Sequence, residues 1–245
     1  MIVTIAAKEL KILFASPLAW IILGVLQLLL AWLFLNQVDA FINVQGQLLQ
    51  LANPPGVTEM VVAPLFGATA MILLVIAPVL AMRLIAEERR NHTLPLLLSA
   101  PLSLGAIVMG KFLGLWAFLC LLIALAAAMA LALFAGGPLD AGLLLISLLG
   151  LVLLAACVAA LGLYFSSLTA HPAVAAISGI GAALGLWLLD IVSQDIAPLH
   201  ALSLLQHFGQ SNRGLLDTAD VGYFLLFTAT FLVLTVLRLD RDRLP

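Results

Sequence analysis

The most concentrated group of residues that could do acid–base chemistry is the pair Glu87-Glu88. Adjacent carboxylates can exchange protons with a substrate, but Arg89 and Arg90 follow at once. Carboxylates beside arginines at a membrane boundary are more often solvated or ion-paired than catalytic. The pair therefore predicts either a docking contact with another protein or plain interfacial charge, and catalysis is disfavoured.

The histidines and cysteines do not form a predicted metal or redox site. His171 lies in a polar turn, and His200 and His207 have no carboxylate or cysteine at metal-ligand spacing. Cys120 and Cys157 lie in apolar runs without CxxC spacing, which is typical of small packing residues. We therefore expect no metal, no cofactor and no catalytic residue in this chain.

Small residues near residue 180 look like fragments of known motifs. Ser178-Gly179 and Gly179-Ile180-Gly181 suggest a nucleophile or phosphate loop, but no GxSxG is complete and no Walker lysine follows. Close helix packing explains Ser178, Gly179, Gly181 and Gly185 better. If ATP drives the function of this chain, a separate subunit must bind the nucleotide.

The composition places these residues in a lipid bilayer. Of 245 residues, 64% are hydrophobic and 9% are charged, whereas soluble domains have about 45–50% apolar and about 25% charged residues. The net charge of −2 and the lack of a Lys/Arg-rich run give no sign of a nucleic-acid partner. The predicted fold class is an all-α integral membrane protein in contact with membrane lipid.

Six apolar stretches are long enough to cross a bilayer, which takes about 20 residues. They cover residues 17–37, 61–82, 106–134, 139–165, 172–189 and 219–237. No charge within them is predicted to be buried, which disfavours a proton- or ion-coupled transporter. The chain is therefore predicted to be one transmembrane domain with six spans.

The basic residues predict the orientation, because Lys and Arg are retained on the cytoplasmic side. With six spans, nine of the ten basic residues fall on the side of both termini, and Arg213 alone falls on the other side. We therefore expect both termini to be cytoplasmic.

Three segments outside the spans have recognisable patterns. Residues 1–16 are amphipathic and predict an interfacial elbow helix. Residues 38–60 predict an outer loop with a short helix ended by the NPPG sequence at 53–56. Residues 190–218 fit either a surface helix or a re-entrant pair, and hydropathy leaves both open.

The loop between spans two and three, residues 87–101, is the most informative segment. After its charged start come a helix-cap candidate at Asn91-His92-Thr93, a leucine cluster at 94–98 and Pro101 as a stop. This pattern predicts a short amphipathic helix whose apolar face needs a protein partner in the cytoplasm.

The loop resembles the corresponding segment of the membrane subunits of type-2 ABC transporters. The matching positions are Glu87-Glu88, Thr93-Leu94, Leu96 to Leu98, Ala100-Pro101 and Gly110-Lys111. Residues 8–20 resemble the elbow helix of that family, 166–177 its turn between spans four and five, and 207–243 its gliding-motility-associated branch. The chain departs from the pattern at His92, where relatives often carry Gly, and at Pro95.

The resemblance implies the permease subunit of an ATP-driven exporter in the bacterial cytoplasmic (inner) membrane. The implied partners are two copies of a cytoplasmic ABC ATPase that binds ATP and Mg, a second permease chain in a homodimer, and an accessory protein with an extracytoplasmic domain. Spans one, two and five would lie near the shared pathway. The implied ATPase-coupling residues are Glu87, Glu88, Thr93, Leu94, Leu97, Leu98 and Pro101.

Two other function classes remain open. A non-transporting scaffold could transmit mechanical work to an outer partner, and the sequence is consistent with this role as well. A membrane-embedded enzyme is disfavoured because no nucleophile and base share a predicted site. The sequence does not indicate the substrate.

Overall fold

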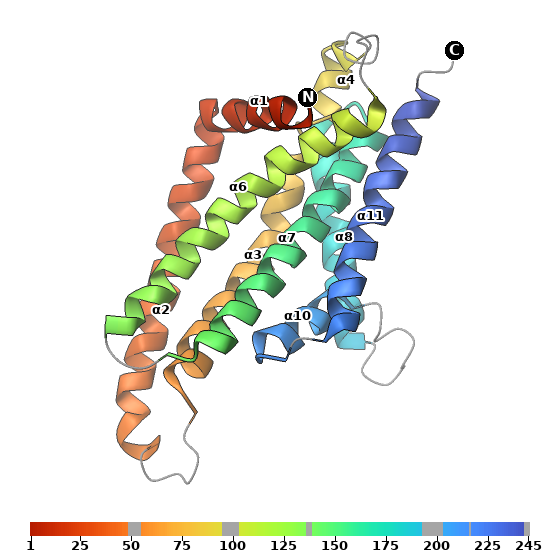
Figure 1. The fold of residues 1–245 in the computed structure, drawn as a ribbon. Coiled ribbons are helices and arrows are strands. Elements are labelled where there is room, and N and C mark those ends of the chain that lie inside the picture. The colour runs from red at the N-terminus through yellow and green to blue at the C-terminus, as the bar shows by residue number, and fades with distance from the viewer. Residues whose placement is uncertain (49–54, 95–102, 136–138, 193–202, 216, 243–245) are drawn as a thin grey trace.

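The computed structural model describes residues 1–48, 55–94, 103–135, 139–192, 203–215 and 217–242. Its elements form a helical bundle, with one helix lying across the end that holds both termini (Figure 1). In chain order they are α1 (Ile2–Ala15), α2 (Pro17–Leu48), η1 (Thr58–Val62), α3 (Ala63–Ala81), α4 (Ala86–Arg90), α6 (Leu104–Ala132), η2 (Leu133–Ala135), α7 (Ala141–Leu168), α8 (Pro172–Val192), α10 (Leu204–Asn212) and α11 (Thr218–Arg241).

The prediction of an all-α membrane protein with six spans is confirmed. Six of the described helical segments are long and apolar enough to cross a membrane, and the described part of the chain contains no strand. Because the number of spans is even, the two termini lie at the same end of the bundle, as Figure 1 shows.

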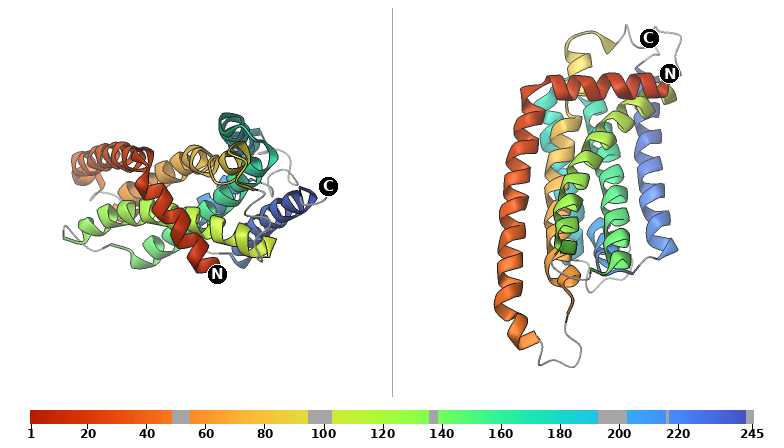
Figure 2. Two further views of the ribbon diagram at one scale, coloured as in Figure 1. Left: turned by 90° about the horizontal axis from the view of Figure 1, so that it is seen from above. Right: turned by 60° about the vertical axis from the view of Figure 1, so that its left-hand side comes forward.

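The spans divide into a central group and a peripheral group. In α3, α6 and α7, 50%, 44% and 56% of the most apolar window is buried inside the chain, against 22% in each of α2, α8 and α11. Seen along the bundle, α2, α3 and α8 lie along one side (Figure 2). The exposed apolar side chains of the peripheral spans therefore face lipid or another protein.

Short polar side chains fix where several helices begin. Asp140 and Asp217 cap the outer ends of α7 and α11, with carboxylate oxygens accepting backbone N–H groups 2.9–3.1 Å away. Ser103 caps α6 in the same way at the opposite end. An acidic cap suits the positive end of the helix dipole, which explains why acidic residues gather where α7 and α11 start.

The elbow between α1 and α2 follows from Ser16-Pro17. Proline disfavours helical geometry in the residue before it, and Ser16 is extended, with φ −84° and ψ 129°. The indole N–H of Trp20 donates to the carbonyl of Phe14 at 2.8 Å and closes the corner. As a result α1 lies across the bundle while α2 runs along it (Figure 1).

The outer end of span one differs from the sequence prediction. Helix α2 continues to Leu48, so the predicted outer loop at 38–60 begins as helix, and residues 53 and 54 of the NPPG sequence lie outside the described residues. The polar residues after position 37 end the apolar span but not the helix, since a helix can continue into water.

Helix α10 lies among the spans and not on their outer surface. A Cβ on Gly150 of α7 would lie 2.7 Å from Cβ of Ser211, and Ser147 donates to the carbonyl of Ser211 at 3.3 Å. These α7 positions lie about 9–14 Å inside the outer end of α7 at 1.5 Å per residue. Within residues 190–218, helix α10 therefore packs against α7 near the outer end of the bundle, and residues 193–202 lie outside the described residues, so the choice between a surface helix and a re-entrant pair stays a prediction.

Candidate functional site

The helix of span two stops before the predicted coupling segment. Helix α3 ends at Ala81, residues 82–85 form a turn, and α4 begins at Ala86. The hydroxyl of Ser166, at the end of α7, accepts the N–H groups of Ile85 at 3.2 Å and Ala86 at 3.1 Å, and donates to the carbonyl of Met82 at 3.1 Å. This fully buried serine uses its one donor and both acceptor sites to hold the break.

Arg89 ties the other side of α4 to the bundle. Its guanidinium donates to the carbonyl of Ser167 at 2.8 Å and pairs with the carboxylate of Asp242, which follows α11. Helix α4 is thus fastened to the ends of α7 and α11. A five-residue helix would not be stable alone, and these tertiary contacts define its position.

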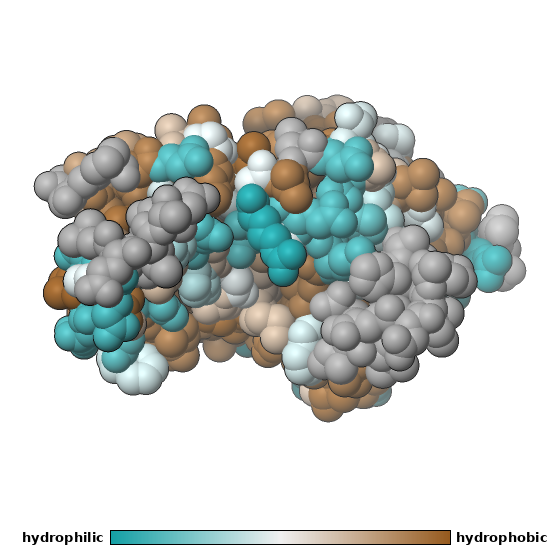
Figure 3. Space-filling view, turned by 90° about the horizontal axis from the view of Figure 1, so that it is seen from below, coloured by the Kyte–Doolittle hydropathy of each residue, from teal (hydrophilic) through white to brown (hydrophobic). Residues whose placement is uncertain are grey.

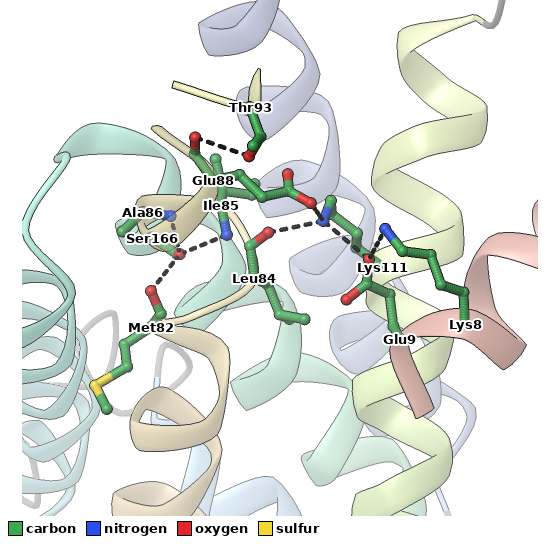
Figure 4. Close-up of polar contacts among 10 residues, drawn as sticks. All are labelled: Lys8, Glu9, Met82, Leu84, Ile85, Ala86, Glu88, Thr93, Lys111 and Ser166. Atoms are coloured by element: carbon green, nitrogen blue, oxygen red, sulfur yellow. Dashed lines mark hydrogen bonds and ion pairs between the residues drawn. The ribbon is translucent and has the colours of Figure 1, made fainter. Parts of the chain in front are cut away.

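Lys111, in the second turn of α6, is the centre of a buried ion cluster (Figure 4). Its ammonium donates to Glu9 Oε1 at 3.0 Å, to Glu88 Oε1 at 2.6 Å and to the carbonyl of Leu84 at 2.8 Å. The residue is 1% exposed and Glu9 is 5% exposed. Because an ammonium has three N–H donors, every donor of Lys111 is used, each on a different element.

Two glycines of α6 bring α1 close enough for this cluster. A Cβ on Gly110 would lie 2.6 Å from Cβ of Ile5, and one on Gly114 would lie 2.8 Å from Cβ of Glu9. The spacing of four places both glycines on one helix face, so α1 crosses directly over them. The Gly-Lys pair at 110–111 therefore has a structural explanation: the glycine admits α1, and the lysine binds its carboxylate.

The outward side of α4 and of the turn after it is polar and exposed. The exposed residues there are Arg83, Glu87, Arg90, Asn91, His92 and Thr93. The chain turns back after α4 because His92 has φ 54°, in the left-handed region. Glycine adopts this conformation at little cost, so the Gly that the family resemblance leads one to expect at this position would fit the turn.

The predicted coupling residues occupy different environments. Glu87 is exposed, Glu88 is turned inward to Lys111, and the hydroxyl of Thr93 donates to the carbonyl of Glu88 at 3.2 Å. Leu94 is 5% exposed and belongs to the core of this chain. Leu97, Leu98 and Pro101 lie outside the described residues.

A cleft separates the elbow helix from the coupling segment. Its walls come from α1, the start of α2, the end of α3 and α4, and both Glu9 and Glu88 line it. Buried apolar side chains, including Leu13, Leu80 and Leu84, line it as well. Where α1 and α4 face each other across this space, the lysine of α6 joins them.

Buried charge inside the spans is the main feature that the sequence prediction missed. The expectation of no buried charge is wrong at two positions, Lys111 near one end and Asp220 near the other. Asp220 Oδ1 lies 2.5 Å from His207 Nδ1, and the His207 ring stacks on Tyr223 with centroids 4.2 Å apart. Both charges lie near span ends and are paired, which is how ionisable groups are tolerated in membranes.

The polar groups of the site make structural contacts between helices. Within the described ranges, no group of three or more His, Cys, Asp or Glu side chains could hold a metal ion. At the end opposite to α1, hydrophilic residues gather over the middle of the face and hydrophobic residues flank them (Figure 3).

Helix α4, at the elbow end, has an exposed side and is attached to the bundle by ion pairs and hydrogen bonds. It contacts α7 and the residue after α11 directly through Arg89, and it contacts α6 through Lys111, which also binds α1.

Comparisons with known proteins identify the family of the chain. No curated protein matches the chain. The family model described as ABC-2 family transporter protein matches residues 3–210, which include the elbow helix, the break after span two, α4, Lys111 and α10. The chain therefore belongs to the ABC-2 transporter family, whose members are the membrane permease subunits of type-2 ABC transporters.

Proposed function

We propose that this chain is the permease of an exporter and that α4 with the residues after it docks on a separate cytoplasmic ABC ATPase. Membership of the family implies an ATP-binding partner subunit. The observation that carries the docking site is the exposed polar surface of α4, with both signs of charge at Glu87 and Arg90. ATP and Mg would be bound by the partner, two copies of which would serve a permease dimer.

The side of the membrane follows from charge. The described basic residues other than Arg213 lie on segments at the end of the bundle that holds α1, α4 and both termini. Retention of Lys and Arg in the cytoplasm supports a cytoplasmic location for that end, in the cytoplasmic (inner) membrane of a bacterium. It is the end at which a soluble ATPase can reach α4.

Removal of the docking surface tests this proposal. The tagged chain is co-expressed with its ABC ATPase, and vanadate-sensitive MgATP hydrolysis is measured in the purified membrane complex. Deletion of residues 91–99 should abolish co-purified hydrolysis, and Arg90→Glu should lower it. Arg241→Glu is the matched control, because Arg241 is an exposed arginine at the same end of the bundle. Undiminished hydrolysis in the deletion variant would refute the docking site.

A homodimer through α8 is part of the proposal. The exposed side of α8 carries Val174, Ile177 and Leu188, which are 52%, 71% and 51% exposed. A Cβ on Gly181, between them, would meet no atom of this chain within 4 Å. Gly179, in contrast, packs on Pro78, as a small packing residue should. Oxidative cross-linking of Ile177→Cys should give dimers, whereas Leu226→Cys on α11 should not.

A second candidate function is mechanical work on an extracytoplasmic partner. The observation that favours it is the outer part of α2, which extends beyond the other helices (Figures 1 and 2). Ile42 on this extension is 60% exposed. A photo-cross-linker at Ile42 should then give a product whose yield differs between nucleotide-free and MgADP–vanadate-trapped complexes. The gliding-motility assignment and its accessory protein remain predictions.

A further inference from the structure

We infer that Lys111 is the positioning residue that carries movement of α4 to the elbow helix α1, so that the elbow is a second moving arm beside spans two and three. This inference rests on the proposed function, because it assumes that an ATPase moves α4. It assigns a specific route for that movement within the permease.

The first observation is the break between α3 and α4. A continuous helix would carry a displacement of the coupling segment directly along span two. Residues 82–85 are not helical, and Ser166 holds both sides of this turn by three hydrogen bonds. The non-helical turn allows α4 to tilt relative to α3 about the point that Ser166 holds on α7, as hinges at element ends do. Such a tilt requires the contacts of Arg89 with the Ser167 carbonyl and Asp242 to open.

The second observation is that the three donors of Lys111 reach three separate elements. Glu88 belongs to α4, the Leu84 carbonyl to the turn before it, and Glu9 to α1. The acceptors are 23, 27 and 102 residues away in the sequence. Lys111 thus links the coupling segment to the N-terminal helix α1, across the cleft that α1 and α4 line.

The third observation is that α1 and α6 are in direct contact at this point. The close contacts of Ile5 with Gly110 and of Glu9 with Gly114 leave no room between the two helices. Packed interfaces of this kind shift between discrete arrangements and do not deform gradually. A pull on Lys111 through Glu88 therefore displaces α1 together with the start of α6.

The charges of the cluster balance, which makes the link persistent. Lys8 lies 3.7 Å from Glu9, so two ammonium groups face two carboxylates. With Lys111 and Glu9 almost fully buried, separating the groups would leave charges in a medium of low dielectric. The link is therefore expected to hold while the cluster moves as a unit.

Spin labels measure the movement of α1 directly. Labels at Val3, which is 77% exposed on α1, and at Asp140, the exposed cap of α7, report the distance across the bundle in a background with Cys120→Ala and Cys157→Ala. Distances are compared between nucleotide-free and MgADP–vanadate-trapped complexes. The parent should show a shift on trapping, and Lys111→Met should lose it while still co-purifying the ATPase.

Matched variants separate transmission from a general effect of charge. Lys11→Met removes the same charge from the exposed face of α1 and should keep the shift, and Lys111→Arg should restore most of it. If Lys111→Met does not assemble, the triple variant Glu9→Gln, Glu88→Gln, Lys111→Met leaves no buried charge in the cluster, since the remaining Lys8 has a side chain that is 57% exposed, and it should also lose the shift.

The inference is overturned if the shift persists in Lys111→Met or in the triple variant, if Lys11→Met loses it too, or if the parent shows none while binding the ATPase. All four results leave the proposed docking function intact. Failure of the parent to bind any ATPase would instead refute the proposed function.

Discussion

The two ends of the bundle each bury a charged residue near the end of a span, but the two contacts join different parts of the chain. At the elbow end, Lys111 binds Glu9 across 102 residues of sequence and Glu88 across 23. At the outer end, Asp220 contacts His207 across 13 residues, and its Oδ2 has no partner in the described part of the chain. The first contact joins separate elements, whereas the second fastens α10 to the helix that follows it.

This difference shows that the elbow end links elements that are distant in the sequence, whereas the outer end links neighbouring elements. A link across a long loop constrains elements that could otherwise separate, whereas a link between neighbouring helices constrains little beyond their hairpin. The elbow end therefore combines an exposed docking surface with long-range fastening. The outer end combines an inserted helix with short-range fastening.

The largest expected effect breaks the ion cluster. Lys111→Met should lower the free energy of unfolding by about 3–5 kcal/mol, because two inward-facing carboxylates lose their cation. Asp220→Asn should cost less, about 1–3 kcal/mol, since it removes one charge-assisted contact. Thermal unfolding in detergent measures both.

A neutral cluster provides the control for that prediction. The triple variant Glu9→Gln, Glu88→Gln, Lys111→Met leaves no buried charge in the cluster, because the remaining Lys8 is exposed to water, so it should be more stable than Lys111→Met alone. Equal losses for Lys111→Met and for the exposed Lys11→Met would contradict the importance of the buried cluster, because the loss would then come from net charge.

The six spans and the position of the elbow helix could be predicted because the information for them is local. Hydrophobicity over about 20 residues decides whether a segment enters lipid, and Ser16-Pro17 marks the corner between α1 and α2. The end of α2 was placed too early, because the polar residues after Gln37 leave the apolar core without ending the helix.

The polar contacts could not be predicted because they depend on tertiary structure. In the sequence, Glu9 belongs to an amphipathic pattern that is typical of a surface helix. The structure shows that α1 crosses Gly110 and Gly114, and this crossing buries Glu9. Ser166 belongs to a turn that the sequence resemblance singled out, but nothing in its neighbourhood indicates that it binds the backbone of residues 82–86. A pattern along one helix does not identify the helix that it meets.

Filling the helix crossings at both ends gives the next largest effect. Gly114→Leu should destabilise by about 1–3 kcal/mol through overpacking, because a Cβ there already lies 3.0 Å from the backbone carbonyl of Ala6. Gly150→Leu should have a similar cost at the α10 crossing, where Cβ of Ser211 is 2.7 Å away. Gly181→Leu is the control within a monomer, because open space surrounds it.

The two crossings should nevertheless differ in function. Gly114→Leu displaces α1 from Lys111, so it should also reduce ATP-dependent movement of the elbow. Gly150→Leu should leave that movement unchanged, as measured by the Val3 and Asp140 spin labels. A loss of elbow movement in Gly150→Leu would mean that the two ends are coupled more tightly than their contacts indicate.

Two buried serines give a smaller and more graded comparison. Ser166→Ala leaves two backbone N–H groups and one carbonyl without their partner, which should cost about 1–3 kcal/mol. Ser147→Ala removes a single bond of 3.3 Å to the Ser211 carbonyl and should cost about 0.5–1.5 kcal/mol. Hydrogen exchange at Ile85 and Ala86 should rise in the first variant alone.

The smallest expected effect concerns the turns that follow α4 and α10. Both turns contain a residue with positive φ, but the residue types differ. His92 has φ 54° after α4, and Gly214 has φ 79° after α10. A side chain costs about 1–2 kcal/mol in the left-handed region, and histidine is among the residues that tolerate it better. His92→Gly should therefore stabilise the chain by up to about 1 kcal/mol, and Gly214→Ala should destabilise it by about 1 kcal/mol.

The sign of the His92 effect decides what that residue contributes. If His92→Gly raises the unfolding midpoint and leaves co-purified ATPase unchanged, the histidine is a tolerated departure from the glycine of relatives. If the same change raises stability but lowers ATPase binding, the exposed ring contributes to docking, and the strain is kept for that contact. A lower midpoint would contradict the conformational argument, because glycine at φ 54° should not be strained.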